Sequence, residues 1–316
     1  MKRYTSIGAL PMGAGPRCVA IGVFDGVHLG HQEVIRQAVE AAKKRAATSM
    51  VITFTPNPLV VLRPELKITQ ITDAHTRVER IERLGVDELL EIAFTSAFSK
   101  IPWERFCEML MGPPVNAVAI SVGENFRFGH GGEGTAAMLR DYARGRGIEV
   151  ESPALVTSLD HKPISSTRIR RLIAQGDVAE VIGLLGRPHV LTGVVVHGDG
   201  RGASLGIPTA NVDVGDHMAV PAKGVYAAKV RVDGRWWASA LNIGHAPTFR
   251  DGGELRLEAF LLDYDGPPIY EETVTIAFLE RIRAEQRFDG PAELIAQVMR
   301  DIDYARQVCA GSPDPL

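Results

Sequence analysis

The apolar pattern of this sequence changes once, close to residue 187, and that change constrains the fold more than any other feature. In the first part, short apolar runs such as Cys18–Ile21, Met50–Phe54 and Ala117–Val122 alternate with segments whose apolar residues recur at helical spacing. This alternation is typical of a parallel sheet covered by crossover helices. We therefore predict an α/β domain over residues 1–186, with functional turns at the carboxyl ends of its strands.

The second part, after the interruption at Gly186–Pro188, consists of apolar runs that follow one another without helical segments between them. Glycine, aspartate and proline separate these runs, which are Val190–Val196, Gly224–Val232, Trp236–Ile243, Leu255–Leu262 and Glu272–Phe278. Several short strands in succession predict a small β-barrel or sandwich. Apolar residues at helical spacing between Pro291 and Val308 predict one closing helix. The second predicted domain spans residues 187–316.

Composition narrows the classes of partner. With 316 residues, 45% of them hydrophobic, the chain is long enough for two cores. A formal net charge of -3 provides no basic field, so we expect small-molecule ligands and no nucleic acid.

Neither a signal peptide nor a membrane anchor is visible, and an oligomer is possible but not indicated. The cysteines Cys18, Cys107 and Cys309 are widely spaced, which favours reduced thiols and a cytoplasmic location.

Residues 22–31, GVFDGVHLGH, place two histidines around one glycine between a predicted strand and a predicted helix. The N-terminus of that helix directs backbone N–H groups and a positive dipole into the turn, which suits a nucleotide phosphate. Gly30 keeps side-chain bulk away, and His28 and His31 can both donate to an anionic, phosphorus-centred transition state. The pattern predicts nucleotidyl transfer. The alternative is an ordinary turn with an N-cap and two solvated rings.

A second glycine-rich loop, residues 123–134, follows the predicted strand that ends at Val122. Gly129, Gly131 and Gly134 satisfy the pattern GxGxxG, so a nicotinamide-dependent oxidoreductase is a competing hypothesis. The match is weak, because the loop follows a late strand and no second set of βαβ units remains once the chain becomes β-rich.

Hydroxyl groups at a predicted helix start precede arginines in residues 163–170, PISSTRIR. Ser166, Thr167 and Arg168 together predict a cradle for ATP phosphates, in which Arg168 neutralises charge on the leaving pyrophosphate. The alternative is an N-cap followed by a solvated basic face, which we favour for Arg171.

A third glycine-rich segment, residues 193–211, ends in the tetrad Pro208-Thr209-Ala210-Asn211. Its glycines permit backbone N–H groups to surround phosphates. Thr209 and Asn211 lie on one side of an extended segment, as a pair of Mg²⁺ ligands requires. The alternative is a glycine-rich hairpin without a ligand. The candidate phosphate-binding residues are Gly198, Gly200, Gly202, Gly206 and Pro208.

Together these motifs resemble the bacterial bifunctional riboflavin kinase and FAD synthetase family over nearly the whole chain. GxFDGxHxGH, ISSTxIR and the glycine-rich PTAN segment match in order, and segments similar to PxxGVY, NxGxxPTF and LRxExxF follow. The resemblance implies a Rossmann-type N-terminal domain like that of HxGH nucleotidyltransferases, and a riboflavin-kinase-like barrel. It also implies that ATP phosphorylates riboflavin to FMN and that a second ATP adenylylates FMN to FAD with release of pyrophosphate, both with Mg²⁺.

The resemblance further implies roles for individual residues. Glu258 would be the general base for the riboflavin 5′-hydroxyl, although a salt bridge to Arg256 is the alternative. Asn242 and Arg283 would contact flavin or phosphate, with a solvated face as the alternative for Arg283. The residues implied to line the ATP and FMN pocket of the first domain are Gly22, Phe24, Asp25, Gly30, Asn125 and Arg127. For Arg127 the alternative is an ordinary surface residue.

The sequence departs from the family pattern at four positions. Asn125 stands where many members carry Asp. Asn57 stands where the family usually has the histidine of Pro-His-Pro, and Asn cannot carry a positive charge. Ala203 replaces a basic residue, and Ala246 replaces a polar one. These departures leave two alternatives open: a chain with only one active module, and a non-catalytic protein that binds flavin or nucleotide.

Overall fold

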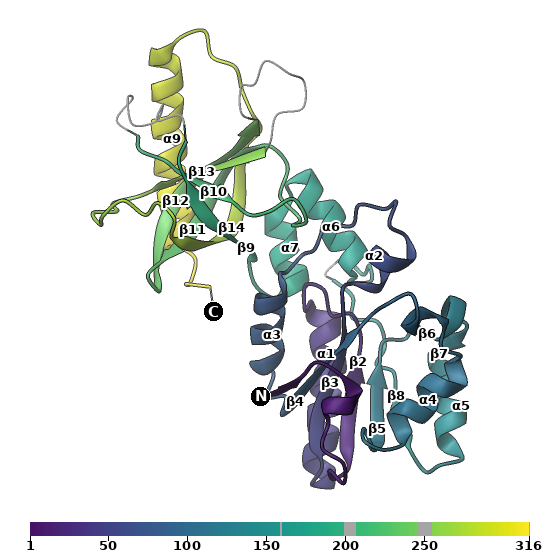
Figure 1. Ribbon diagram of the computed structural model, residues 1–316. Coiled ribbons are helices and arrows are strands. Elements are labelled where there is room, and N and C mark those ends of the chain that lie inside the picture. Colours follow the sequence, from purple (N-terminus) through teal and green to yellow (C-terminus); the bar gives the residue numbers. More distant parts are fainter. Residues whose placement is uncertain (159, 199–206, 246–254, 316) are drawn as a thin grey trace. The chain divides into compact units, whose positions relative to one another are not determined.

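The computed structural model describes residues 1–158, 160–198, 207–245 and 255–315. They form two compact units (Figure 1). The first contains Met1–Ile68 and Ala74–Ser165, and the second contains Thr69–Asp73 and Ser166–Leu316. A five-residue segment from the first part of the sequence therefore belongs to the second unit. No described helix is long and apolar enough to cross a membrane.

The first unit is built on a six-stranded sheet whose neighbouring strands are all parallel. Its order is β1-β4-β3-β2-β5-β8, with β1 Lys2–Tyr4, β2 Arg17–Ile21, β3 Thr48–Thr55, β4 Glu88–Ala93, β5 Ala117–Val122 and β8 Glu149–Glu151. The helices are α1 Leu29–Arg45, α2 Pro58–Leu62, α3 Ala74–Glu82, α4 Trp103–Met111 and α5 Ala136–Arg144, with short 3₁₀ turns at Ile7–Ala9, Phe98–Lys100 and His130–Gly132. The predicted parallel α/β domain is confirmed.

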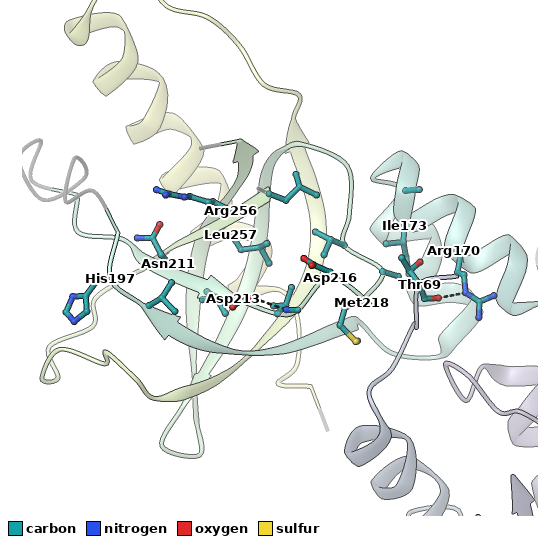
Figure 2. Close-up of a pocket in the computed structure, with 18 residues that line it drawn as sticks. Thr69, Arg170, Ile173, His197, Asn211, Asp213, Asp216, Met218, Arg256 and Leu257 are labelled. Atoms are coloured by element: carbon teal, nitrogen blue, oxygen red, sulfur yellow. Dashed lines mark hydrogen bonds between the residues drawn. The ribbon is translucent and has the colours of Figure 1, made fainter. Parts of the chain in front are cut away.

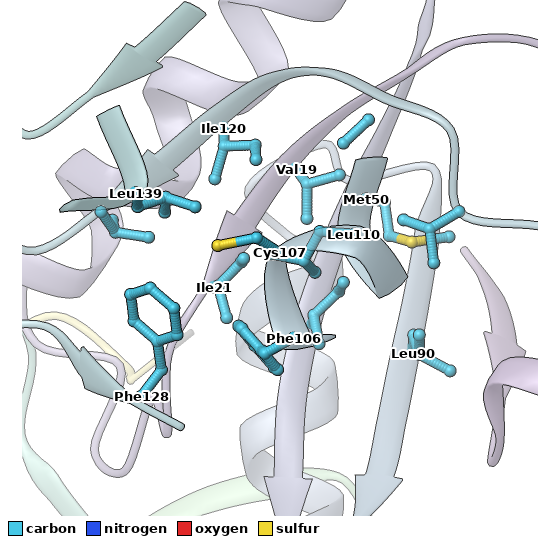
Figure 3. Packing of buried hydrophobic residues seen from close by; sticks show 14 of the residues in the cluster. Val19, Ile21, Met50, Leu90, Phe106, Cys107, Leu110, Ile120, Phe128 and Leu139 are labelled. Atoms are coloured by element: carbon cyan, nitrogen blue, oxygen red, sulfur yellow. The ribbon is translucent and has the colours of Figure 1, made fainter. Parts of the chain in front are cut away.

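Helices cover both faces of this sheet, because its central strands are apolar on both sides. Every residue of β2 is buried. Val19 and Ile21 pack toward Phe106 and Leu110 of α4, as Figure 3 shows. Ala20, which points the other way, packs in a second cluster with side chains of α1 and α3. Each such side chain, when fully buried, stabilises the fold by about 1.5–3 kcal/mol.

A buried ion pair holds the amino ends of two strands. Arg17, the first residue of β2, is 1% exposed, and its Nε lies 2.6 Å from Oε2 of Glu88, the first residue of β4. The same guanidinium donates to the carbonyl oxygens of Pro114 and Val115 at 2.7 and 3.1 Å. Because a buried charge is tolerated only when its hydrogen bonds are made, this end of the sheet is structural. Ligand-binding turns belong at the opposite, carboxyl end.

The second unit is built on a closed barrel of six antiparallel neighbours. The order is β10-β13-β12-β11-β14-β9, with β9 His189–Val196, β10 Ala210–Asp213, β11 Gly224–Val232, β12 Arg235–His245, β13 Leu255–Leu261 and β14 Thr273–Arg283. Tyr226, Leu241, Leu257 and Phe278 fill its interior. The helix α9, Pro291–Ala310, packs Ile302 and other side chains on the outer face. The barrel and the closing helix are confirmed.

Two helices that precede the predicted boundary at residue 186 fall in the second unit. They are α6, Ser166–Gln175, and α7, Val178–Leu185. Val178 belongs to the barrel's interior cluster, and the carbonyl oxygen of Ile173 accepts from Ala222 N at 3.2 Å. Packing therefore groups both helices with the barrel, whereas the assignment of function to residues 1–186 and 187–316 stays a prediction.

Candidate functional site

The first candidate site is the turn between β2 and α1. His28 is the N-cap of α1, with φ -70° and ψ 170°, and its Nδ1 accepts from the backbone N–H of His31 at 3.2 Å. A neutral imidazole that accepts at Nδ1 carries its proton on Nε2. The ring of His28 is 5% exposed. The fold thus fixes the tautomer and orientation of a nearly buried imidazole at the N-terminus of a 17-residue helix.

The structure brings the two histidines together. Their rings stack with centroids 3.6 Å apart and planes 16° apart, and the Phe24 ring meets His31 edge-on at 5.3 Å. A Cβ on Gly30 would lie 3.2 Å from His28 Cε1, and one on Gly22 would lie 2.9 Å from the Phe24 ring. Both glycines therefore permit close packing, with the aromatic ring and the imidazoles held as one group. Asp25, 4% exposed, completes the buried side of this turn.

Asn57 lies directly beyond β3, the neighbour of β2, and caps the short helix α2. Its Oδ1 accepts from Leu59 N at 3.0 Å, and the residue is 7% exposed. Nearby, Thr53 Oγ1 donates to the carbonyl oxygen of Val23 at 3.0 Å and ties β3 to the turn before His28. An N-cap needs an acceptor side chain and no positive charge. Asn57 therefore has a complete structural role in the loop.

The segment after β5 brings two further candidates to the carboxyl end of the sheet. Asn125 and Arg127 are both exposed there, and β5 pairs with β2, the strand that leads to His28. Arg127–Phe128 forms β6, which pairs with β7, Gly134–Thr135, before α5 begins. Asn125 and Arg127 therefore follow the same carboxyl edge of the sheet as the histidines. The sequence predicted functional turns at this edge.

The glycines of this segment have packing roles. A Cβ on Gly129 would lie 2.7 Å from the Trp103 backbone, and one on Gly134 would lie 2.7 Å from the Phe128 ring. The hairpin of β6 and β7 separates β5 from α5, whereas a dinucleotide fingerprint joins strand and helix through one tight turn. The structure therefore does not support the nicotinamide hypothesis at this loop.

Ser166, Thr167 and Arg168 open α6 in the second unit. Arg168 Nη2 lies 2.6 Å from Glu180 Oε1 of α7. The guanidinium thus already has an anionic partner within its own unit. Arg171 is exposed and donates to Gln175 on the same helix at 3.1 Å, which agrees with the solvated face expected there.

The second candidate site is a row of polar residues across three strands of the barrel. Asn211 on β10 is paired with Glu258 on β13, and Glu258 with Asn242 on β12. Their neighbours Val212, Leu257, Leu241 and Ile243 belong to the barrel interior. Because side chains alternate along a strand, the three polar side chains lie on the outer face. The structure therefore brings three predicted kinase residues into one cross-strand row.

The side-chain amide of Asn211 lies against the neighbouring loop and presents an unsatisfied oxygen. A Cβ on Gly198 would lie 2.1 Å from Asn211 Nδ2, so the start of the glycine-rich loop lies against this amide. Asn211 Oδ1 is buried, with no hydrogen-bond partner among the described residues. Such an oxygen is normally satisfied by a ligand, ion or water. Thr209, half-buried, lies two residues earlier. The described residues hold no cluster of three His, Cys, Asp or Glu.

Arg283 is paired with an acidic residue of the closing helix. Its Nη2 lies 2.7 Å from Asp301 Oδ2 of α9, and its Nε lies 3.0 Å from the same oxygen. Asp301 is 3% exposed. This bidentate pair fastens the closing helix to β14, so the structure gives Arg283 a stabilising role and no ligand contact is needed to explain it. Gly200, Gly202, Ala203, Gly206 and Ala246 lie outside the described residues.

The comparisons with known proteins identify the family. Residues 12–168 match the model of FAD synthetase, and residues 185–309 match that of riboflavin kinase. A Listeria monocytogenes protein named bifunctional riboflavin kinase/FMN adenylyltransferase is 38% identical over 299 residues, which are 94% of each chain. This chain belongs to the bifunctional riboflavin kinase/FMN adenylyltransferase family. A Bacillus subtilis member is 36% identical, over 90% of this chain and 89% of its own.

A solved structure shares the fold of this chain over nearly its whole length. The crystal structure described as a macrolide-efflux protein from Streptococcus pneumoniae is 34% identical to this chain and has a TM-score of 0.86. It covers 96% of this chain, and the match spans 98% of its own length. The recognition of the family from the GxFDGxHxGH and PTAN motifs is confirmed.

A pocket of about 630 Å³ adjoins the polar row of this family member (Figure 2). It extends from Asn211 and Leu257 past the loop that follows β10 toward Arg170, whose Nε donates to Thr69 O at 2.6 Å. No sequence motif predicted the pocket residues Thr69, Asp213, Asp216 and Met218. Asp213 follows the PTAN tetrad by two residues, and its Oδ1 accepts from Gly215 N in the turn after β10.

Proposed function

We propose that this chain makes FAD from riboflavin in two steps, with the kinase reaction in residues 187–316 and the adenylyl transfer in residues 1–186. The observation that carries the proposal is the row of Asn211, Glu258 and Asn242, which supplies a ligand oxygen and a carboxylate side by side on the barrel. A phosphoryl transfer to an alcohol needs both. The stacked histidines at the start of α1 supply the chemistry of the second step.

In the kinase step, the riboflavin 5′-oxygen attacks the γ-phosphorus of ATP while Glu258 accepts the hydroxyl proton, and ADP leaves. An alcohol is a poor nucleophile at neutral pH, so a positioned carboxylate is required. Thr209 and Asn211 fit a Mg²⁺ site, because Asn211 presents a buried, unsatisfied oxygen and Mg²⁺ prefers few protein oxygens beside phosphates. Bound there, the ion would screen the charge of the triphosphate.

In the adenylyl step, a phosphate oxygen of FMN attacks the α-phosphorus of ATP, and the bond to the β-phosphate breaks as pyrophosphate leaves. No general base is needed, because a phosphate monoester is ionised at neutral pH. The N–H groups of His28 and His31, with the dipole of α1, stabilise the additional negative charge. The family resemblance assigns Asn125 and Arg127 to the nucleotide and flavin pocket, and it assigns Ser166, Thr167 and Arg168 to the phosphates of ATP.

The substrates are free small molecules, and we place the reaction in the cytoplasm. Cys18, Cys107 and Cys309 are buried, free thiols, which suits a reducing compartment. The net charge of -3 is consistent with ligands bound in local pockets and no nucleic acid partner.

Two substitutions separate the activities. Glu258→Gln keeps size and hydrogen bonding, and FMN formation should fall about a thousandfold with FAD formation from FMN unchanged. His28→Asn keeps an N-cap acceptor but removes the imidazole, and FAD formation should fall about a hundredfold with FMN formation unchanged. Chromatography of the flavins measures both. Equal loss of the two activities in either variant would contradict separate sites, and no product from the parent chain would favour a binding protein.

A further inference from the structure

Arg77 on α3 is hydrogen-bonded to the last residue of β3, at the carboxyl edge of the first unit's sheet. Its Nη2 donates to Thr55 Oγ1 at 3.0 Å. Arg77 is 8% exposed, whereas Thr55 is an exposed residue. Val78 and Ile81, which follow Arg77 on the helix, are buried against the sheet and hold α3 in place. The bond therefore joins a buried cation to a hydroxyl group that a ligand can reach.

Thr55 lies on the face of β3 that contacts the turn between β2 and α1. Side chains alternate along a strand, so Thr53 and Thr55 point to the same face. Thr53 Oγ1 donates to Val23 O at 3.0 Å, in the segment that leads to His28. Thr55 follows two residues later, about 6.6 Å further along the strand. Its hydroxyl group therefore lies at the edge of the candidate adenylyl site.

A carboxylate on the neighbouring strand orients Arg77. Oε1 of Glu91 on β4 lies 3.7 Å from Arg77 Nη2, and its Oε2 lies 2.9 Å from Arg3 Nη2. The longer separation exceeds hydrogen-bond distance, so Glu91 acts on Arg77 by charge and is bonded to Arg3. The short bond of Arg77 Nη2 is the one to Thr55.

The direction of this bond determines what Thr55 can do. A guanidinium group only donates, so the Thr55 oxygen is the acceptor and the hydroxyl keeps its own hydrogen for another partner. A hydroxyl that accepts from a cation is polarised and becomes a stronger donor. A phosphate oxygen is the anionic acceptor that suits such a donor.

We propose that Thr55, held by Arg77, donates a hydrogen bond to a substrate phosphate in adenylyl transfer. The inference rests on the proposed adenylyl function and adds two residues that no sequence motif indicated. Arg77 acts through Thr55 as a positioning residue. Asn57, two residues after Thr55, carries no charge, so Arg77 supplies from α3 a positive charge that the loop after β3 lacks at this position. The phosphate is that of ATP or of FMN, and the experiment separates the two.

The test measures kcat and both KM values for FAD formation from FMN and ATP. Thr55→Val keeps the shape of the side chain but removes the hydroxyl. The KM of one substrate should rise about tenfold with kcat unchanged, as expected for loss of one hydrogen bond to a charged group. A rise for ATP alone assigns the bond to ATP, and a rise for FMN alone assigns it to FMN. Thr55→Ser keeps the hydroxyl and should match the parent chain.

Substitutions of Arg77 test the positioning role. Arg77→Met should raise the same KM, and Arg77→Lys, which keeps a cationic donor, should raise it less. Because the two residues act through one contact, adding Thr55→Val to Arg77→Met should cause no further rise. Arg105→Met is the control, since it removes an exposed arginine of the same unit, paired with Glu108 at 2.8 Å on α4. This control should leave both KM values unchanged, and FMN formation from riboflavin should stay unchanged in every variant.

Circular dichroism checks that each variant is folded. Parent KM values for both substrates in a folded Thr55→Val variant would overturn the proposal. Equal effects of Thr55→Val and Thr55→Ser, or additive effects of the Thr55 and Arg77 substitutions, would also overturn it. A parent chain that makes no FAD from FMN would refute the adenylyl function itself, and the inference with it.

Discussion

Asn211 and Glu258 face each other as directly opposed residues of the antiparallel strands β10 and β13. Opposed residues of such a pair have Cβ atoms about 5 Å apart, which leaves room for a phosphoryl group beyond their two side chains. The residues are separated by a long stretch of sequence, and closure of the barrel brings them together. The PTAN strand and the carboxylate thus lie side by side on the barrel.

The close contact between Gly198 and Asn211 predicts a severe effect from a single methyl group. Gly198→Ala would place a Cβ 2.1 Å from Asn211 Nδ2, so the amide must move. A displacement of about 1 Å can lower a rate about a hundredfold, and we expect this loss in kcat for FMN formation. Gly183→Ala on α7 is the control, because nothing lies within 4 Å of its Cβ. If the two variants formed FMN at equal rates, the reaction would not depend on the position of the Asn211 amide.

The pair of Arg283 and Asp301 predicts a structural effect. Asp301→Ala leaves a largely buried guanidinium without its partner, and the free energy of unfolding should fall by about 3 kcal/mol. The double variant Arg283→Met/Asp301→Leu removes both charges and should regain most of that stability. Denaturant unfolding measures stability, and FMN formation measures function. A stable double variant without kinase activity would show that Arg283 contacts a ligand, as the sequence predicted.

Buried His189 predicts a pH dependence of stability. Its Nε2 lies 2.8 Å from Ala219 O, and burial lowers its pKa from 6.5 to about 4. Between these values the unfolded chain binds more protons than the folded one, so stability falls as pH falls through this window. The contribution lost between pH 7 and pH 5 is about 2 kcal/mol. Urea unfolding of the parent chain and of His189→Gln should show this loss only in the parent.

Because Asn57 caps α2, we predict that asparagine at this position, in place of the family's histidine, is tolerated. Asn57→Ala removes the bond to Leu59 N and should lower the free energy of unfolding by about 1 kcal/mol. FAD formation should change less than twofold, since the Asn57 side chain is already engaged by Leu59 N and carries no positive charge for a phosphate. Calorimetry and the flavin assay measure these effects. A hundredfold loss of FAD formation with unchanged stability would instead give Asn57 a part in catalysis.

Much of the fold could be predicted from local sequence pattern. Apolar runs such as Cys18–Ile21 indicated buried parallel strands, and the spacing from Pro291 to Val308 indicated α9. The strand order could not be predicted, because pairing of distant strands leaves no local pattern. The strand β1 was not predicted either, since Lys2–Tyr4 is three residues long and two of them are exposed.

The same contrast between local pattern and long-range contact applies to the candidate sites. Motifs located His28, His31 and Asn211, because these residues are adjacent to recognisable turns and glycines. Sequence could not show that Arg168 pairs with Glu180, or that Arg283 pairs with Asp301. Such ion pairs join separate elements, and either arginine alone has the pattern of a ligand contact or of a solvated face.

The two-step synthesis of FAD is tested most directly by a time course with the purified full chain, ATP, Mg²⁺ and riboflavin as the only flavin. Chromatography follows the three flavins. We expect riboflavin to decline, FMN to rise and then fall, and FAD to accumulate with one pyrophosphate for each FAD. FMN that accumulates without any FAD, or riboflavin that stays unchanged, would contradict it.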